Sequence, residues 1–108
     1  MTFMELVLKI RDLYEDADAR EVFEHIAIEI HVTGEAAGVF YIEVAERHVC
    51  VEPYDYHDKD IVVCVDTEMM LKLLNREIDF YQAVGRGLIE IHGNRDKYLL
   101  LQKIRLQK

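Results

Sequence analysis

The chain has 108 residues, of which 51% are hydrophobic and 31% are charged. This length and composition predict one folded domain over residues 1–108 and exclude a disordered chain. The formal net charge is −8, which argues against nucleic-acid binding because that affinity depends on neutralising phosphates. The hydrophobic runs are too short to span a bilayer and no signal-peptide pattern is visible, so a cytoplasmic location is expected.

The first predicted element is an amphipathic helix over residues 2–18. Hydrophobic side chains recur there at the helical spacing of three and four residues, as in Phe3, Leu6 and Val7. Thr2 and Glu5 have the spacing of a capping box, which marks the start of a helix. A short helical turn is expected to follow at residues 19–25.

Four strands are predicted next. In the first two, hydrophobic and polar residues alternate, which is typical of a sheet with one solvated face. Pro53 ends the third because proline has no N–H to donate to a neighbouring strand, and the fourth is nearly all hydrophobic, as in an interior strand. We expect these strands to form a meander over residues 26–33, 39–46, 48–52 and 61–65.

The remaining residues predict two short helices, a fifth strand and a last helix. Asp66 or Thr67 caps the first helix, and Asp79 caps the second. The fifth strand is expected at residues 88–92 and the last helix at residues 94–106. Helices and strands in this order, with one polar strand face, favour an α+β domain whose sheet is covered mainly on one side.

The residues that carry catalysis in common enzymes are scarce. No serine is present, which excludes a Ser-His-Asp triad. Cys50 and Cys64 have no metal-ligand spacing, and the acidic segment at residues 55–60 reads as a solvated loop. We therefore predict no catalytic residue, no metal and no cofactor; the many charges and few amides hint at a thermophilic source.

Four motifs in the second half of the chain occur in a familiar order. They are an acid-opened strand at residues 60–65, a helix at residues 66–74, a short acidic and aromatic helix at residues 78–87, and a strand at residues 88–95 before a leucine-rich helix. Residues 40–104 resemble the sterol carrier protein 2 family in these motifs.

Two short segments depart from the family pattern. Asn75-Arg76-Glu77 stands where the family usually has a glycine that ends the helix. Gly85-Arg86-Gly87 has an arginine where a glycine-lysine pair is commoner, and Arg86 is a candidate to meet a lipid head group.

The resemblance implies a specific architecture: α+β, with a five-stranded mostly antiparallel sheet and helices on one face, enclosing an apolar cavity for lipid. It also implies a binding module rather than an enzyme. For each residue we place on the cavity wall, ordinary core packing is the alternative, and it is the commoner role of hydrophobic residues. The predicted ligand-binding residues are Phe40, Ile42, Val44, Val63, Val65, Met70, Leu71, Leu74, Phe80, Val84, Leu101 and Ile104.

A cavity in so small a domain is constrained by its own cost. An empty hydrophobic void of about 300 Å³ would cost about 7 kcal/mol, whereas the whole stability of a domain is about 5–15 kcal/mol. The cavity must therefore collapse, open to solvent or stay occupied. Flexible side chains such as Met69 and Met70 suit a wall that adapts to its ligand.

The resulting expectation is non-enzymatic carriage of a fatty-acyl, sterol-like or isoprenoid lipid. One alternative is an accessory subunit that presents a lipid to a partner enzyme, as a homodimer or through the exposed sheet face. Another is a small isomerase or hydrolase with a carboxylate in an apolar pocket. The basic segment at residues 95–108 is a candidate for transient contact with an anionic membrane, or for cations that favour a helix C-terminus.

Overall fold

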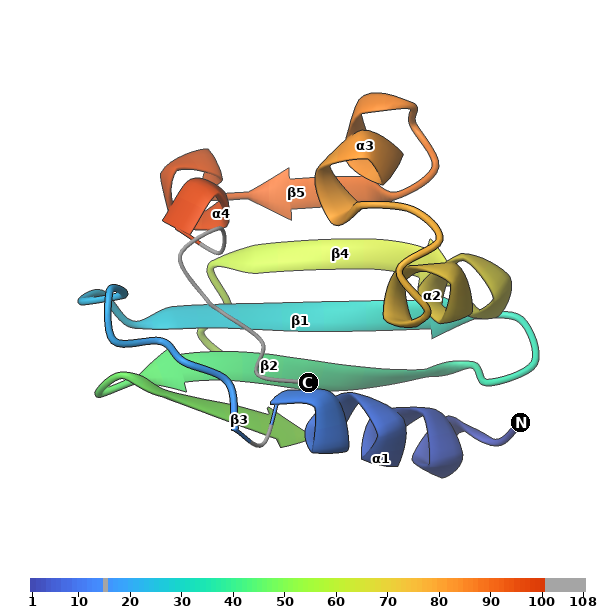
Figure 1. Ribbon diagram of the computed structural model, residues 1–108, viewed down its shortest axis with the longest axis horizontal. Coiled ribbons are helices and arrows are strands. Elements are labelled where there is room, and N and C mark those ends of the chain that lie inside the picture. The colour runs from blue at the N-terminus through green and yellow to red at the C-terminus, as the bar shows by residue number, and fades with distance from the viewer. Residues whose placement is uncertain (15, 101–108) are drawn as a thin grey trace.

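The computed structural model describes residues 1–14 and 16–100. A five-stranded mixed sheet with strand order β3-β2-β1-β4-β5 is packed against helices (Figure 1). The elements are α1 (Phe3–Tyr14), β1 (Ile26–Thr33), β2 (Gly38–Ala45), β3 (His48–Glu52), β4 (Ile61–Asp66), α2 (Thr67–Leu74), α3 (Phe80–Gly85), β5 (Glu90–Gly93) and α4 (Arg95–Leu100). The predicted α+β class and the mostly antiparallel sheet are confirmed.

The predicted four-strand meander is wrong at its last step. β1, β2 and β3 pair antiparallel as expected, but β4 pairs in parallel with β1 instead of following β3. The chain at residues 53–60 returns past β2 to reach the free edge of β1. Alternation along a strand shows which residues share a face, but it does not show which edge the strand will occupy.

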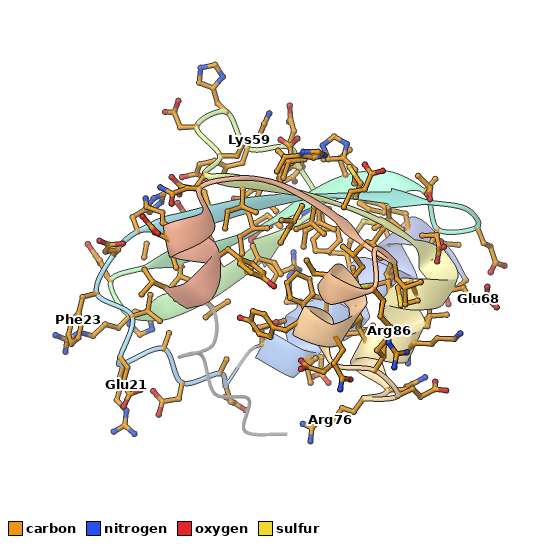
Figure 2. The ribbon with its side chains drawn as sticks, turned by 90° about the horizontal axis from the view of Figure 1, so that it is seen from above. Glu21, Phe23, Lys59, Glu68, Arg76 and Arg86 are labelled. Carbon is orange, nitrogen blue, oxygen red and sulfur yellow. The ribbon has the colours of Figure 1, made fainter. Side chains whose placement is uncertain are left out.

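One face of the sheet, here called the inner face, packs into the hydrophobic core. Ile28 lies opposite Ile42, and Ile30 lies opposite Phe40 on one side and Val63 on the other. All five are buried, because alternate residues of neighbouring strands point to the same side. Figure 2 shows the helices on this side of the sheet and Lys59 on the opposite side.

α1 packs its hydrophobic stripe against the sheet next to edge strand β3 (Figure 1). The predicted capping box is present: Glu5 accepts from the Thr2 N–H at 2.9 Å and the Thr2 hydroxyl accepts from the Glu5 N–H at 3.2 Å. Arg11 reaches the edge strand, where its Nε donates to the Val51 carbonyl at 3.1 Å and its guanidinium pairs with Glu52.

The main differences from the predicted elements lie at the end of α1, at residues 19–25 and at the start of β5. α1 ends at Tyr14, and residues 19–25 form turns and bends, so the helical turn predicted there is wrong. The Asp18 carboxylate accepts from the Arg20 N–H at 3.0 Å, a local bond that competes with helix formation. β5 begins at Glu90, because the Leu88 N–H donates to the Ala83 carbonyl and continues the end of α3.

Aspartate side chains start α2 and α3, as the sequence predicts, and an asparagine that the sequence prediction did not identify as a cap starts α4. Asp66 accepts from the Met69 N–H at 2.6 Å, and Asp79 accepts from the Tyr81 N–H at 3.4 Å. Asn94 caps α4 through the Asp96 and Lys97 N–H groups. α4 is described as far as Leu100; the rest of the helix predicted to residue 106 lies outside the described residues.

No helix within residues 1–14 and 16–100 is both long and hydrophobic enough to cross a membrane.

Asp60 joins three separate parts of the fold just before β4. Its carboxylate accepts from the Ala27 N–H of β1 at 2.9 Å and from Lys97 Nζ of α4 at 3.0 Å. Its backbone N–H donates to the Ala27 carbonyl, and its carbonyl accepts from the Asn94 N–H. Burial raises the pKa of this carboxyl, but the Ala27 and Lys97 bonds outweigh burial, so the pKa is lowered.

We predict that Asp60→Ala lowers the free energy of unfolding by about 2–3 kcal/mol, because the N–H of the fully buried Ala27 loses its charged acceptor. Lys97→Met is the matched control, since it leaves the Ala27 bond in place and removes the ion pair with Asp60 together with the bond from Lys97 Nζ to the His25 carbonyl. A partly exposed ion pair contributes about 1 kcal/mol or less. Urea denaturation measures both. Equal decreases in the free energy of unfolding in the two variants would show that the bond to Ala27 is not the main contribution of Asp60.

We predict that Gly93→Ala destabilises the fold by about 3 kcal/mol or more. Gly93 has φ of +117°, and an added Cβ would collide with the backbone carbonyl of Asp60. Gly85→Ala is the control, because a Cβ there meets no atom of the described residues within 4 Å outside its own helix, and it should change stability by about 1 kcal/mol or less. Thermal unfolding of both variants, read by circular dichroism, makes the comparison.

Candidate functional site

A pocket of about 820 Å³ lies between the inner face of the sheet and the helices. Among the described residues its wall is almost entirely hydrophobic, with Arg76 and Asp79 as the charged members. The lining residues are Ile10, Leu13, Tyr14, Ile28, Ile30, Phe40, Ile42, Val63, Val65, Met70, Leu73, Leu74, Arg76, Ile78, Asp79, Phe80, Tyr81 and Ile89.

The sheet supplies the floor of this pocket through its regular alternation. β1, β2 and β4 each contribute two side chains spaced two residues apart, such as Ile28 and Ile30, or Val63 and Val65. The opposite wall comes from the end of α1 and from α2, α3 and the turn between them. Helices of six to eight residues leave part of the sheet uncovered, which produces the space.

Seven of the predicted ligand-binding residues line the pocket: Phe40, Ile42, Val63, Val65, Met70, Leu74 and Phe80. Val44, Leu71 and Val84 are not among its described lining residues. Val44 is fully buried in the core, and Leu71 and Val84 are partly buried against that core. Leu101 and Ile104 lie outside the described residues.

The sequence prediction missed the contributions of β1 and α1. Ile28 and Ile30 line the pocket, and their signal was available, since the alternation in β1 is as clear as that in β2. Leu13 and Tyr14 belong to the hydrophobic stripe of α1, but a stripe does not show which of its turns faces a gap rather than the core.

Three aromatic rings adjoin the pocket where α3 meets α4. The ring centroids of Phe80 and Tyr81 are 5.6 Å apart, and those of Phe80 and Tyr98 are 5.8 Å apart. Tyr81 and Tyr98 complete the set at 5.1 Å. Aromatic pairs in this range attract one another, so the cluster ties α3, which lines the pocket, to α4.

The charged lining residues both belong to the turn between α2 and α3. The Asp79 carboxylate is the N-cap of α3. Arg76 follows the end of α2 and has φ of 60°. Arg86, the residue that the sequence suggested for a head group, is the C-cap of α3 and is not among the described lining residues.

The opposite side of the sheet, here called the outer face, holds a buried carboxylate network. Glu29 of β1 is only 3% exposed. Its oxygens contact His31 Nε2 at 2.5 Å, the Tyr56 N–H at 3.1 Å and Lys59 Nζ at 3.4 Å. Burial raises the pKa of this carboxyl, but the three contacts outweigh burial and the pKa is lowered.

A second network on the outer face is centred on Glu43 of β2. The Tyr56 hydroxyl donates to Glu43 Oε2 at 2.5 Å, and His25 Nε2 lies 2.6 Å from the same oxygen. The bond to Glu43 raises the pKa of Tyr56 to about 12, and the Tyr56 and His25 bonds lower the pKa of Glu43. Tyr56 also packs edge-on against Tyr41, so the network fixes the loop at residues 53–60 to the sheet.

The histidines are separated from the pocket by the sheet. His31, His48 and His92 lie on the outer face by register, His25 contacts Glu43 there, and His57 belongs to the loop packed on it. The described pocket lining contains no histidine, and its one carboxylate, Asp79, caps a helix. The described wall therefore offers mainly hydrophobic contact.

We predict that stability falls in acid as Glu29, Glu43 and Asp60 are protonated. Their folded-state pKa values are lowered from ordinary values of 4.5, 4.5 and 3.8. Their stabilisation is therefore complete above those values and is lost as pH falls below them and through the folded values. Urea midpoints measured from pH 7 to pH 3 should decrease, and Glu43→Gln should flatten the decrease; an unchanged slope in the variant would contradict the assignment to Glu43.

The family model of the SCP-2 sterol transfer family matches residues 5–105. The chain belongs to this family, which confirms the resemblance seen in residues 40–104 and extends it to α1. A comparison with curated proteins found no match. Family membership and the shared fold support lipid binding or transfer as the role of the domain.

Solved structures with the same fold have low sequence identity to this chain. Sterol carrier protein 2 like 2 from Aedes aegypti has a TM-score of 0.70 at 16% identity, covering 91% of each chain. A palmitated form of that protein has a TM-score of 0.65 at 18% identity, covering 90% of this chain and 88% of its own.

Two further structures connect the fold to other proteins. The ubiquinone synthesis protein UbiJ-SCP2 has a TM-score of 0.64 at 17% identity, covering 94% of this chain and 87% of its own. The sec-alkylsulfatase Pisa1 from Pseudomonas sp. has a TM-score of 0.68 at 11% identity, covering 89% of this chain but only 16% of the sulfatase. The fold therefore also forms a small part of a longer enzyme chain.

Proposed function

We propose that this protein binds and carries a long-chain lipid in the pocket beneath its sheet, without chemistry of its own. The observation that carries the proposal is the 820 Å³ pocket with its nearly continuous hydrophobic wall. A fatty-acyl chain is the first candidate, supported by the palmitated Aedes aegypti protein of the same fold. Isoprenoid and sterol-like ligands are the other chains that such a wall accommodates.

The energetics are adequate for reversible binding. Burial of a hydrocarbon tail contributes about 0.8 kcal/mol per methylene group, and association costs about 4–15 kcal/mol in lost freedom. A tail of about 16 carbons therefore contributes about 13 kcal/mol, which exceeds all but the upper end of that cost. The bound ligand also stabilises the fold, by about 2.7 kcal/mol when its free concentration is 100 times Kd.

A second candidate function is the presentation of a lipid substrate to an enzyme. It is favoured by the alkylsulfatase, in which this fold is a minor part of an enzyme chain, and by the ubiquinone synthesis protein. The same pocket serves both functions. Purification from native extract separates them, since a presenting subunit brings a stoichiometric enzyme with it and a carrier does not.

We predict that Val63→Phe abolishes or strongly reduces lipid binding, because the larger side chain fills the pocket from the middle of β4. Val62→Phe is the matched control: it makes the same change one residue away, on the outer face. Binding is measured by displacement of the neutral dye Nile red with palmitate and with 1-hexadecanol, and folding is checked by circular dichroism.

Equal losses of binding in both variants would contradict the assignment of the pocket.

Native mass spectrometry of the purified protein, followed by lipid extraction, tests the function itself. The expected result is a co-purified lipid, or a thermal shift with at least one fatty acid, isoprenoid or sterol. If no lipid co-purifies and none of these compounds shifts the thermal unfolding, the proposal is rejected.

A further inference from the structure

Tyr14, the last residue of α1, lines two pockets at once. One is the large pocket between the sheet and the helices. The other, here called the edge pocket, has a volume of about 440 Å³ and lies between α1 and the edge strand β3 (Figure 1). Tyr14 is the residue common to the two described linings, so the two spaces meet at its side chain. The edge pocket is lined by Leu8, Arg11, Asp12, Tyr14, Val49, Cys50, Val51 and Glu52.

The Tyr14 hydroxyl has no hydrogen-bond partner within residues 1–14 and 16–100, and burial alone raises its pKa. Among the described residues that are not exposed, every side-chain nitrogen or oxygen shut off from solvent does have a partner. The Tyr14 hydroxyl is therefore not sealed in the core. It keeps contact with the open space beside the ring, which is the space of the two pockets.

This hydroxyl affects binding because a hydrophobic ligand displaces the water around it. A ligand with no polar atom at that point leaves the donor unpaired, and an unpaired buried donor lowers affinity. A ligand with an oxygen at that point restores the hydrogen bond. A site that bonds its ligand in this way discriminates against an analogue that lacks the acceptor.

The surroundings of the hydroxyl favour an uncharged acceptor. Arg11, the cation of the described edge-pocket lining, is already engaged: its guanidinium pairs with Glu52 at 3.1 Å and its Nε donates to the Val51 carbonyl at 3.1 Å. A carboxylate that enters a hydrophobic space without a cation loses far more solvation free energy than a neutral carbonyl does. The neutral donor of Tyr14 therefore matches a neutral oxygen.

We propose that Tyr14 is a specificity-determining residue whose hydroxyl donates a hydrogen bond to an uncharged oxygen of the ligand, such as an ester or ketone carbonyl. The hydrophobic tail lies beneath the sheet, and the polar end lies at the junction with the edge pocket. The inference rests on the proposed function and deepens it, since it names the polar group that the ligand carries and the end of the pocket where that group lies.

The test compares methyl palmitate with n-octadecane, which have chains of the same length and differ in the ester group. Tyr14→Phe removes only the hydroxyl. It should weaken methyl palmitate binding about fivefold, the effect of one neutral hydrogen bond, and leave octadecane binding within about twofold. Displacement of Nile red measures the four affinities, which together form a double cycle of hydroxyl against ester.

Tyr54→Phe is the matched control. It removes the same hydroxyl from a side chain that is 63% exposed and lies outside both described linings. It should change neither affinity by more than about twofold.

Thermal unfolding separates a role in binding from a role in folding. Tyr14→Phe should leave Tm within about 2 °C of the wild type, because the variant loses no hydrogen bond of the described protein. A merely structural hydroxyl would instead lower Tm and weaken both ligands alike.

Four results would overturn the inference. They are unchanged methyl palmitate binding in Tyr14→Phe, equal losses for methyl palmitate and octadecane, an equal loss in Tyr54→Phe, and a loss for palmitate in Tyr14→Phe as large as that for methyl palmitate. Each of these leaves the proposed carrier function intact. A wild-type protein that binds neither chain also rejects the assignment of Tyr14, whereas the carrier function is decided separately by the lipid that co-purifies.

Discussion

The fold depends on a mismatch between a long hydrophobic sheet face and the short helices that cover it. β1, β2 and α2 each have eight residues and α3 has six. Because a helix rises about 1.5 Å per residue and a strand about 3.3 Å, α2 and α3 are much shorter than the strands and leave part of the inner face uncovered. A dry void of 820 Å³ would cost about 20 kcal/mol. That exceeds the whole stability of a typical domain, so the space must hold water or a hydrophobic guest.

The two faces of the sheet divide the chemistry of the molecule. The inner face offers hydrophobic contact, whereas the outer face gathers the histidines together with the Glu29 and Glu43 networks. The loop at residues 53–60 is the crossing segment that places β4 beside β1, and it is also the segment that Tyr56 and Lys59 fix to the outer face. The polar networks thus support the connection that makes the sheet mixed, and they hold Glu29, Glu43, His25 and His31 on the side of the sheet away from the pocket.

Much of this architecture could be predicted from local patterns. The strand alternation, the capping box at Thr2 and the aspartate caps at Asp66 and Asp79 are all encoded within a few residues, and each is present. The position of β4 could not be predicted in this way, because pairing with β1 is decided by long-range contacts such as that of Asp60 with Ala27.

The pocket was predictable in kind but not in detail. Alternation placed Phe40, Ile42, Val63 and Val65 on the inner face, and all four line the pocket. Val44 shares that face but is buried in the core, because the distinction depends on which helix lies above each strand position. The left-handed conformation of Arg76 was not predictable from its side chain, since arginine has no preference for that region.

The contact of Arg11 with β3 has a consequence for self-association. An unprotected edge strand is a template on which a second molecule can extend the sheet. At Val51 of β3 the backbone carbonyl already accepts a hydrogen bond from Arg11 Nε. α1, which lines part of the pocket, therefore also hinders the pairing of a second molecule with the edge strand β3.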